Sequence, residues 1–165
     1  MSSLPRLRAL ALFALLACAG TARAELQAGD PLPPLGSTPD KTPQTRNHVV
    51  LLDFWASWCA PCKASFPAFA RLHNDFADRG LVIIAVGVDD KESAHEAFLR
   101  RMQPPFFTMR DADHSIVSAA GVPAMPTSYL FGRDGKLRYI HRGFHGKDTE
   151  KELRTEIEAL LKEDG

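Results

Sequence analysis

Two continuous apolar runs, residues 49–55 and 81–88, dominate the pattern of hydrophobic and polar positions along the chain. Runs of this length without alternation are typical of strands buried on both faces of a sheet. From Ala60 onward, apolar positions recur at steps of three and four residues until Gly80, which predicts an amphipathic helix that ends at the glycine. Strand, helix and strand in this order predict a right-handed βαβ unit with parallel strands, so the expected fold class is α/β.

Shorter elements are expected in the second half of the chain. They are an amphipathic helix over residues 93–102, an edge strand over 106–109 and one or two helical turns over 115–120. Runs 127–131 and 137–141 flank an Asp134-Gly135 step, which is a strong signal of a hairpin between antiparallel strands. A capping box from Thr149 to Glu152 predicts the start of a last helix that covers one face of the sheet.

The first 24 residues have the pattern of an export signal. Arg6 and Arg8 precede an apolar stretch over residues 9–17, and Ala22-Arg23-Ala24 matches an A-x-A cleavage site. The apolar stretch is shorter than the roughly 20 residues that a membrane-spanning helix needs. We therefore predict cleavage after Ala24 and a mature protein in an exported, periplasmic compartment.

Cys18 offers an alternative to free secretion. Leu15-Leu16-Ala17-Cys18 resembles the lipobox of bacterial lipoproteins, in which the cysteine carries lipid and becomes the mature N-terminus. Residues 25–47 follow the signal; they are polar and rich in proline, show no period of either kind, and are expected to form an irregular lead-in. The remaining residues, 48–165, are expected to form a single domain.

Charge and cysteine content exclude several classes of protein. The chain carries 20 basic and 20 acidic residues, and removal of residues 1–24 takes away three arginines and no acid, for a net charge of −3. This balance gives no sign of a nucleic-acid partner or of attraction to an anionic membrane. Cleavage also removes Cys18, so that Cys59 and Cys62 remain, too few for a disulfide-stapled scaffold. We expect the domain to be a monomer.

Cys59-Ala60-Pro61-Cys62 lies where the first predicted strand gives way to the first predicted helix. The first turn of a helix has unpaired N–H groups and the positive end of the macrodipole, and both favour a thiolate at Cys59. Cys59 is therefore expected to be the nucleophile, and Cys62, about one turn later, to resolve the mixed disulfide. The same spacing also makes half of a zinc site, so the motif by itself leaves both interpretations open.

Two segments together carry a resemblance to a known family. They are Asp53-Phe54-Trp55-Ala56-Ser57-Trp58-Cys59-Ala60-Pro61-Cys62-Lys63 and Gly121-Val122-Pro123-Ala124-Met125-Pro126-Thr127. From about residue 29 to the last predicted helix, the chain resembles exported thioredoxin-like proteins of the TlpA/ResA family, which are thiol:disulfide oxidoreductases. The resemblance implies a thioredoxin-like fold with a central mixed β-sheet flanked by helices.

The resemblance also implies a substrate site beside Cys59. In such proteins the proline that corresponds to Pro126 is cis, and the backbone of the residue before it, here Met125, pairs with an extended substrate chain. Met125 and Trp58 would then form an apolar collar around the nucleophile. Trp58, Met125, Pro126 and Thr127 are thus the expected substrate-binding residues.

Asp53 is an acid within an apolar run and is expected to be buried, which raises the pKa of a carboxyl. Thioredoxins use an acid six residues before the first cysteine as a proton shuttle for the second, so the resemblance implies that Asp53 takes the proton of Cys62. One departure concerns Ser65, because many relatives carry a glutamate at this place. Asp53 is then expected to act alone, or the thiols to respond differently to pH.

We expect a reductase of protein disulfides that needs no cofactor and receives electrons from a membrane-borne thiol donor. Its substrate stays open between apocytochrome c, a metal-assembly protein and a misoxidised protein. Two alternatives remain: a copper-binding or other metallochaperone that uses the cysteines with His141 or His145, and a thiol peroxidase. Histidines beyond a hairpin strand are usually solvated, and the charged residues 89–92 are also expected to be solvated.

Overall fold

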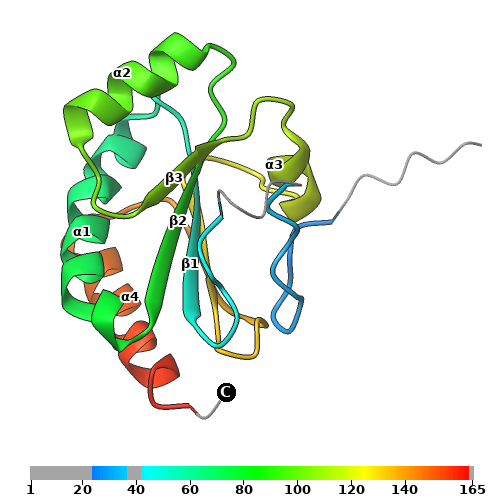
Figure 1. Ribbon diagram of the computed structural model, residues 1–165, viewed down its shortest axis with the longest axis vertical. Helices are drawn as coiled ribbons and strands as arrows, with labels where there is room; N and C mark the ends of the chain where they lie inside the picture. The colour runs from blue at the N-terminus through cyan, green and yellow to red at the C-terminus, as the bar shows by residue number, and fades with distance from the viewer. Residues whose placement is uncertain (1–23, 37–41, 164–165) are drawn as a thin grey trace, which may run out of the picture.

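The structure is a computed structural model that describes residues 24–36 and 42–163 of the 165-residue chain. Residues 1–23 of the predicted export signal, including Cys18, lie outside the described residues. Five strands form one sheet in the order β3-β2-β1-β4-β5 (Figure 1). Their bounds are Val49–Trp55 for β1, Leu81–Gly87 for β2, Phe107–Arg110 for β3, Thr127–Phe131 for β4 and Leu137–Arg142 for β5.

Strand β1 lies at the centre of the sheet and joins its two halves. It runs parallel to β2 and antiparallel to β4. Strand β3 extends the sheet beside β2 in parallel, and β5 extends it beside β4 in the antiparallel direction. The predicted βαβ unit, the hairpin and the mixed sheet are all confirmed, and β3 is the edge strand that the sequence predicts.

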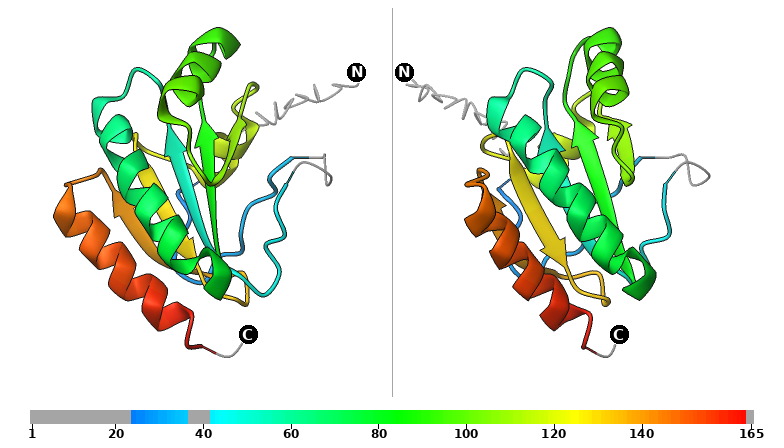
Figure 2. Two further views of the ribbon diagram at one scale, coloured as in Figure 1. Left: turned by 60° about the vertical axis from the view of Figure 1, so that its left-hand side comes forward. Right: turned by 90° about the vertical axis from the view of Figure 1, so that its left-hand side faces the viewer.

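Helices cover both faces of the sheet. They are α1 (Ala60–Phe76), followed by the 3-10 turn η2 (Ala77–Arg79), then α2 (Glu92–Met102), α3 (Ser115–Ala120) and α4 (Lys147–Leu160). Helices α1 and α4 lie side by side on one face, and α3 lies on the other (Figures 1 and 2). Phe98 of α2 joins the core beneath α1 and α4, whereas Leu26 of the lead-in joins Ile116 of α3 in the opposite core.

Alternate residues of β1 supply these two cores, because successive side chains of a strand point to opposite faces. Leu51 and Trp55 pack with α1 and α4, whereas Leu52 and Phe54 pack with α3 and the lead-in. All seven residues of β1 are buried, which explains why the run in the sequence is continuous. Asp53 has the same parity as Leu51 and Trp55, so its carboxyl lies on the α1 side of the sheet.

The lead-in packs along the sheet through backbone contacts. In its described part it forms no helix, and no strand apart from an isolated bridge at Pro31. The Leu26 N–H donates to the Ala120 carbonyl over 3.1 Å, and the Gly29 N–H donates to the Leu137 carbonyl over 2.8 Å. Among the residues described, none of the helices combines the length and apolarity needed to cross a membrane.

The start of the last helix differs from the prediction. Helix α4 begins at Lys147 after an N-cap glycine, Gly146, whose φ is 69°, so the capping box predicted at Thr149 is wrong. The Thr149 hydroxyl instead accepts a hydrogen bond from the His145 N–H over 3.0 Å. The helix begins earlier because glycine adopts positive φ without steric cost and turns the chain before Thr149.

Candidate active site

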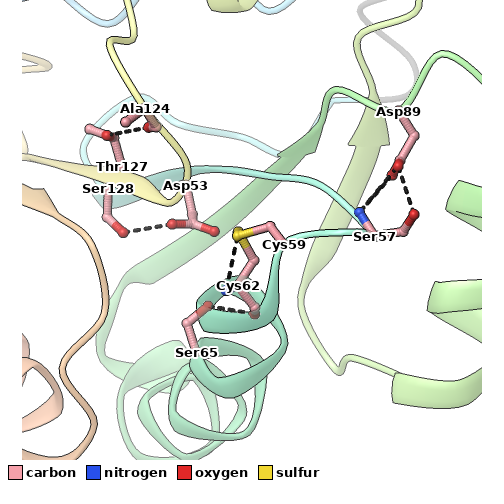
Figure 3. The surroundings of a disulfide bond; sticks show 9 residues. All are labelled: Asp53, Ser57, Cys59, Cys62, Ser65, Asp89, Ala124, Thr127 and Ser128. Atoms are coloured by element: carbon pink, nitrogen blue, oxygen red, sulfur yellow. Dashed lines mark hydrogen bonds between the residues drawn. A yellow bond between two sulfur atoms is a disulfide. The ribbon is translucent and has the colours of Figure 1, made fainter.

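The two cysteines form a disulfide at the N-terminus of α1 (Figure 3). The Cys59–Cys62 bond joins residues whose Cα atoms are 5.3 Å apart. Cys59 is the N-cap residue of the helix, and its sulfur accepts the Cys62 N–H over 3.3 Å. Cys59 is 5% exposed, whereas Cys62 is completely buried. The sequence therefore placed the pair correctly at the junction between β1 and α1.

This position supports unequal roles for the two sulfur atoms. In the reduced protein, an anionic Cys59 sulfur would lie against the unpaired N–H groups and the positive dipole end of a 17-residue helix. Both interactions favour the thiolate form, which is the reactive form of a cysteine. Cys62 lies inside the first turn and is covered, so an incoming disulfide meets Cys59 first.

Asp53 is a completely buried carboxyl that points toward the disulfide (Figure 3). The Ser128 hydroxyl on the neighbouring strand β4 donates to its Oδ1 over 2.6 Å. Its other oxygen, Oδ2, has no hydrogen-bond partner among the described residues. Burial raises the pKa of Asp53 to about 7, and the hydrogen bond from Ser128 lowers it by a smaller amount. A carboxyl with this pKa can both accept and release a proton near neutral pH.

The loop before β4 lies at the same end of the sheet as the cysteines. Phe54, next to the end of β1, pairs with Thr127 at the start of β4. The Met125–Pro126 peptide bond is cis, as the family resemblance implies. The Thr127 hydroxyl donates to the Ala124 carbonyl over 2.8 Å and closes the loop. Pro126 and Thr127 are buried, and Met125 is half-buried.

Trp58 is the most exposed large apolar side chain of the described residues, at 71%. It directly precedes Cys59 in the chain. Met125 packs partly against both cores. The apolar collar formed by Trp58 and Met125 stays a prediction.

Ser65 occupies the place where the family resemblance implies an acid. Its side chain is completely buried, and its hydroxyl donates to the Cys62 carbonyl over 2.9 Å. The hydroxyl thus satisfies a backbone group of the helix and supplies no proton acceptor that titrates near neutral pH. Asp53 is the titratable residue that Figure 3 shows pointing toward the disulfide.

Asp89 is a functional candidate that the sequence analysis missed. We expected it to be solvated, but it is only 3% exposed and accepts hydrogen bonds from Ser57, two residues before Cys59 (Figure 3). The signal was present: Asp89 follows a predicted buried strand that lies beside the strand leading to the cysteines. The prediction was wrong because it followed the charged run, which is usually solvated, and not the position of Asp89 beside the strand that leads to the cysteines.

His141 is also not the solvated histidine that we expected. Its side chain is 11% exposed, and its Nε2 lies 2.6 Å from a Glu156 carboxylate oxygen on α4. Its Nδ1 lies 3.8 Å from Glu152. His141 is therefore paired with α4 and is not directed to the thiols. In the described part of the chain, no cluster of three or more His, Cys, Asp or Glu side chains could hold a metal ion.

Comparison with known proteins places the chain among thioredoxin-like families. The model of the AhpC/TSA family matches residues 35–140. The chain belongs to the AhpC/TSA family. Thiol-disulfide oxidoreductase ResA from Bacillus subtilis is 34% identical to the chain over 94 residues, and the match covers 57% of this chain and 52% of that protein. Other curated relatives of the chain are also named ResA.

A second ResA, from Geobacillus thermodenitrificans, is 29% identical over 115 residues, covering 70% of this chain and 64% of the relative. The chain thus spans between about half and two thirds of the length of the curated relatives that it matches. The TlpA/ResA resemblance is confirmed.

Solved structures confirm the fold. A protein from Chlorobium tepidum assigned as thiol:disulfide interchange protein DsbE has a TM-score of 0.74 and 32% identity, and the match covers 83% of this chain and 99% of that one. The thioredoxin domain of a thiol-disulfide oxidoreductase from Bacteroides vulgatus has a TM-score of 0.69 at 19% identity, covering 81% and 99%. At that identity, the second match supports the fold alone. The thioredoxin-like fold is confirmed.

Proposed function

We propose that this protein is a thiol:disulfide oxidoreductase that reduces disulfides of other proteins in an exported compartment. One observation carries the proposal. A completely buried carboxyl, Asp53, has an oxygen without a partner and points toward a cysteine pair at a helix N-terminus. Burying a carboxyl with an oxygen that has no partner lowers the stability of the fold, and buried titratable groups of this kind cluster at functional sites. Proton transfer with a thiol is the function that this geometry supports.

The first step is attack by Cys59. Its thiolate sulfur bonds to one sulfur of the substrate disulfide, the substrate S–S bond breaks, and the other substrate sulfur leaves as a thiolate that takes a proton from water. The product is a mixed disulfide between Cys59 and the substrate. At this stage one substrate thiol has been released. One S–S bond has formed and one has broken, so the protein and the substrate together have gained and lost no electrons.

The second step needs a proton acceptor for Cys62. The ionised Asp53 carboxylate takes the thiol proton, and the Cys62 thiolate attacks the Cys59 sulfur. The mixed disulfide breaks, the second substrate sulfur leaves as a thiolate, and the Cys59–Cys62 disulfide forms. The substrate has gained two electrons and the protein has lost two. Asp53 then returns its proton to solvent.

The substrate is an extended polypeptide in this proposal. It would pair with the backbone of Met125 next to Pro126 and Thr127, and it would rest its apolar side chains on Trp58. The 71% exposure of Trp58 supports this assignment, because large apolar groups exposed beside a reactive centre are typical of protein-binding surfaces. The identity of the substrate protein stays open.

Export and electron supply complete the proposal. The N-terminal pattern that ends at Ala24 supports secretion, with lipid attachment at Cys18 as the alternative. A reductant in an oxidising compartment must itself be reduced again, so we include a membrane-borne thiol donor as a partner. The protein acts as a monomer.

Trapping of substrates tests this function and the roles of the two cysteines. The Cys62→Ser variant lacks the resolving thiol and is expected to accumulate mixed disulfides with exported proteins, visible on non-reducing gels. The matched Cys59→Ser variant is expected to accumulate few, because Cys62 is covered. Equal trapping by both variants would contradict the assigned roles. Turnover of hydrogen peroxide by the wild-type protein, without reduction of protein disulfides, would favour a thiol peroxidase instead.

A further inference from the structure

The carboxylate of Asp89 ties the end of β2 to the loop that leads to Cys59. Both of its oxygens lie 3.1 Å from the Ser57 N–H nitrogen, and Oδ1 accepts the Ser57 hydroxyl over 2.7 Å. The two residues are 32 positions apart in the chain. Figure 3 shows Asp89 directed to Ser57 on the side of the site away from Asp53.

This contact begins where the pairing of the strands ends. The Val88 N–H donates to the Trp55 carbonyl over 2.9 Å, just beyond the last paired residues of β1 and β2. The following turn contains one backbone hydrogen bond, from the Cys59 N–H to the Ala56 carbonyl over 3.1 Å. The Asp89 side chain therefore continues the connection between the two segments into the turn that presents the nucleophile.

His95 lies beside Asp89, and its buried Nδ1 has no hydrogen-bond partner among the described residues. Its ring stacks on Trp55 with centroids 5.1 Å apart, and its Nδ1 lies 4.0 Å from Asp89 Oδ2. His95 fits because Gly87 has no side chain: a Cβ there would lie 2.5 Å from His95 Nδ1. The hydrogen bonds from the Ser57 N–H and hydroxyl therefore orient the buried carboxylate.

We propose that Asp89 is a positioning residue for the exchange reaction. It fixes the turn at residues 56–59 so that the exposed Trp58 indole and the Cys59 sulfur are presented together to a protein disulfide. The inference rests on the proposed function, because such presentation matters only when a folded or extended protein must dock before its disulfide is attacked. A small disulfide, which needs no docking surface, should react independently of it.

Two probes with different needs test the proposal on the reduced protein. The rate of insulin reduction measures attack on a docked protein disulfide, and the rate of reaction with 5,5′-dithiobis(2-nitrobenzoate) measures attack on a small one. Asp89→Ala is expected to lower the rate of insulin reduction about tenfold, because a docked protein disulfide cannot follow a displaced sulfur and small misplacements of reacting groups are costly. The rate with the small disulfide is expected to change less than about twofold. Asp90→Ala is the matched control, because it removes an exposed carboxylate from the same loop and should change neither rate.

A second variant keeps the test valid if Asp89→Ala fails to fold, which thermal unfolding of each variant reveals. Ser57→Ala removes the hydroxyl bond and leaves both backbone contacts, so a selective loss of about threefold is expected toward insulin. Equal losses with both probes, or no loss with insulin, would overturn the positioning role. A wild-type protein that reacts with the small disulfide but not with any protein disulfide would overturn the proposed function itself.

Discussion

At Asp53, burial and one hydrogen bond act on the carboxyl in opposite directions. Burial disfavours the charged form, and the Ser128 hydroxyl favours it. The balance leaves the pKa at about 7, whereas an exposed aspartate titrates near 3.8. Between pH 3.8 and about 7, the carboxyl is ionised in the unfolded chain and protonated in the folded protein. The free energy of unfolding therefore falls as the pH rises through this range.

Replacement of this carboxyl by an amide is therefore expected to stabilise the protein at high pH. Asp53→Asn removes the burial cost of the charge and keeps an oxygen that can accept from Ser128. Its free energy of unfolding should exceed that of wild type above pH 7, by at most about 4 kcal/mol, and should approach it below pH 4. Urea denaturation of the oxidised proteins at pH 4, 6 and 8 measures the difference. A difference independent of pH would show that Asp53 does not titrate in this range.

The same substitution should slow product release. Asp53→Asn leaves no proton acceptor for Cys62, so turnover is expected to fall most around neutral pH, while the first mixed disulfide forms at nearly the wild-type rate. Single-turnover and steady-state rates between pH 6 and 9 separate the two steps. If the pH–rate profile does not change, Asp53 has no part in the mechanism.

Ser128 provides a complementary variant. The hydrogen bond from its hydroxyl lowers the Asp53 pKa, so Ser128→Ala is expected to raise that pKa and to move the pH dependence of turnover to higher pH. Thr155 on α4 is an exposed residue whose hydroxyl donates to the Lys151 backbone carbonyl instead, so Thr155→Val serves as the control. Profiles that coincide for Ser128→Ala and wild type would contradict the coupling of Ser128 to the reaction.

At the scale of the elements, the position of the lead-in depends on a close backbone contact with the end of α3. Gly121 closes α3 with a φ of 60°, and a Cβ there would lie 2.7 Å from the Ala24 carbonyl oxygen and the Glu25 nitrogen. The Glu25 carboxylate is held in turn by Arg142 at the end of β5, over 2.8 and 3.0 Å. A side chain at position 121 should therefore displace the lead-in from the loop that carries Pro126.

Two glycine variants separate this contact from backbone strain. Gly135 also has positive φ, at 73°, but a Cβ there meets nothing within 4 Å. Gly135→Ala should cost about 1 kcal/mol of unfolding free energy from strain alone, and Gly121→Ala about 3 kcal/mol because a backbone contact is lost as well. Chemical denaturation measures both. Equal costs would show that the lead-in adapts without loss.

For the whole molecule, the direction of electron flow depends on how far the fold stabilises the reduced cysteines. The residues between them, Ala60 and Pro61, offer no charge and no side-chain hydrogen bond, and an ionised Asp53 opposes a nearby thiolate. Strong oxidants of this fold stabilise their reduced form and reach about −120 mV, whereas thioredoxin lies near about −270 mV. We expect this protein to resemble thioredoxin.

Equilibration of the purified domain with dithiothreitol and glutathione buffers measures this potential. A midpoint near about −270 mV would agree with a reductase, and a midpoint above about −180 mV, in the range of isomerases and oxidants, would falsify it. Because thiol–disulfide potentials depend on pH, the measurement belongs at pH 7 with Asp53→Asn in parallel. That variant should be less reducing, since the charge that opposes the thiolates is absent.

The order of the elements, the mixed α/β architecture and the position of the cysteine pair could all be predicted from the sequence. Apolar runs, helical periods and the Asp134-Gly135 turn are local signals, and each depends on residues close in the chain. Which polar groups are buried together could be seen only in the folded protein. Asp89 joins Ser57 across 32 positions and His141 joins Glu156 across 15. Such pairs form because particular strands and helices become neighbours in the fold. A local pattern of charges in the sequence does not predict these neighbours.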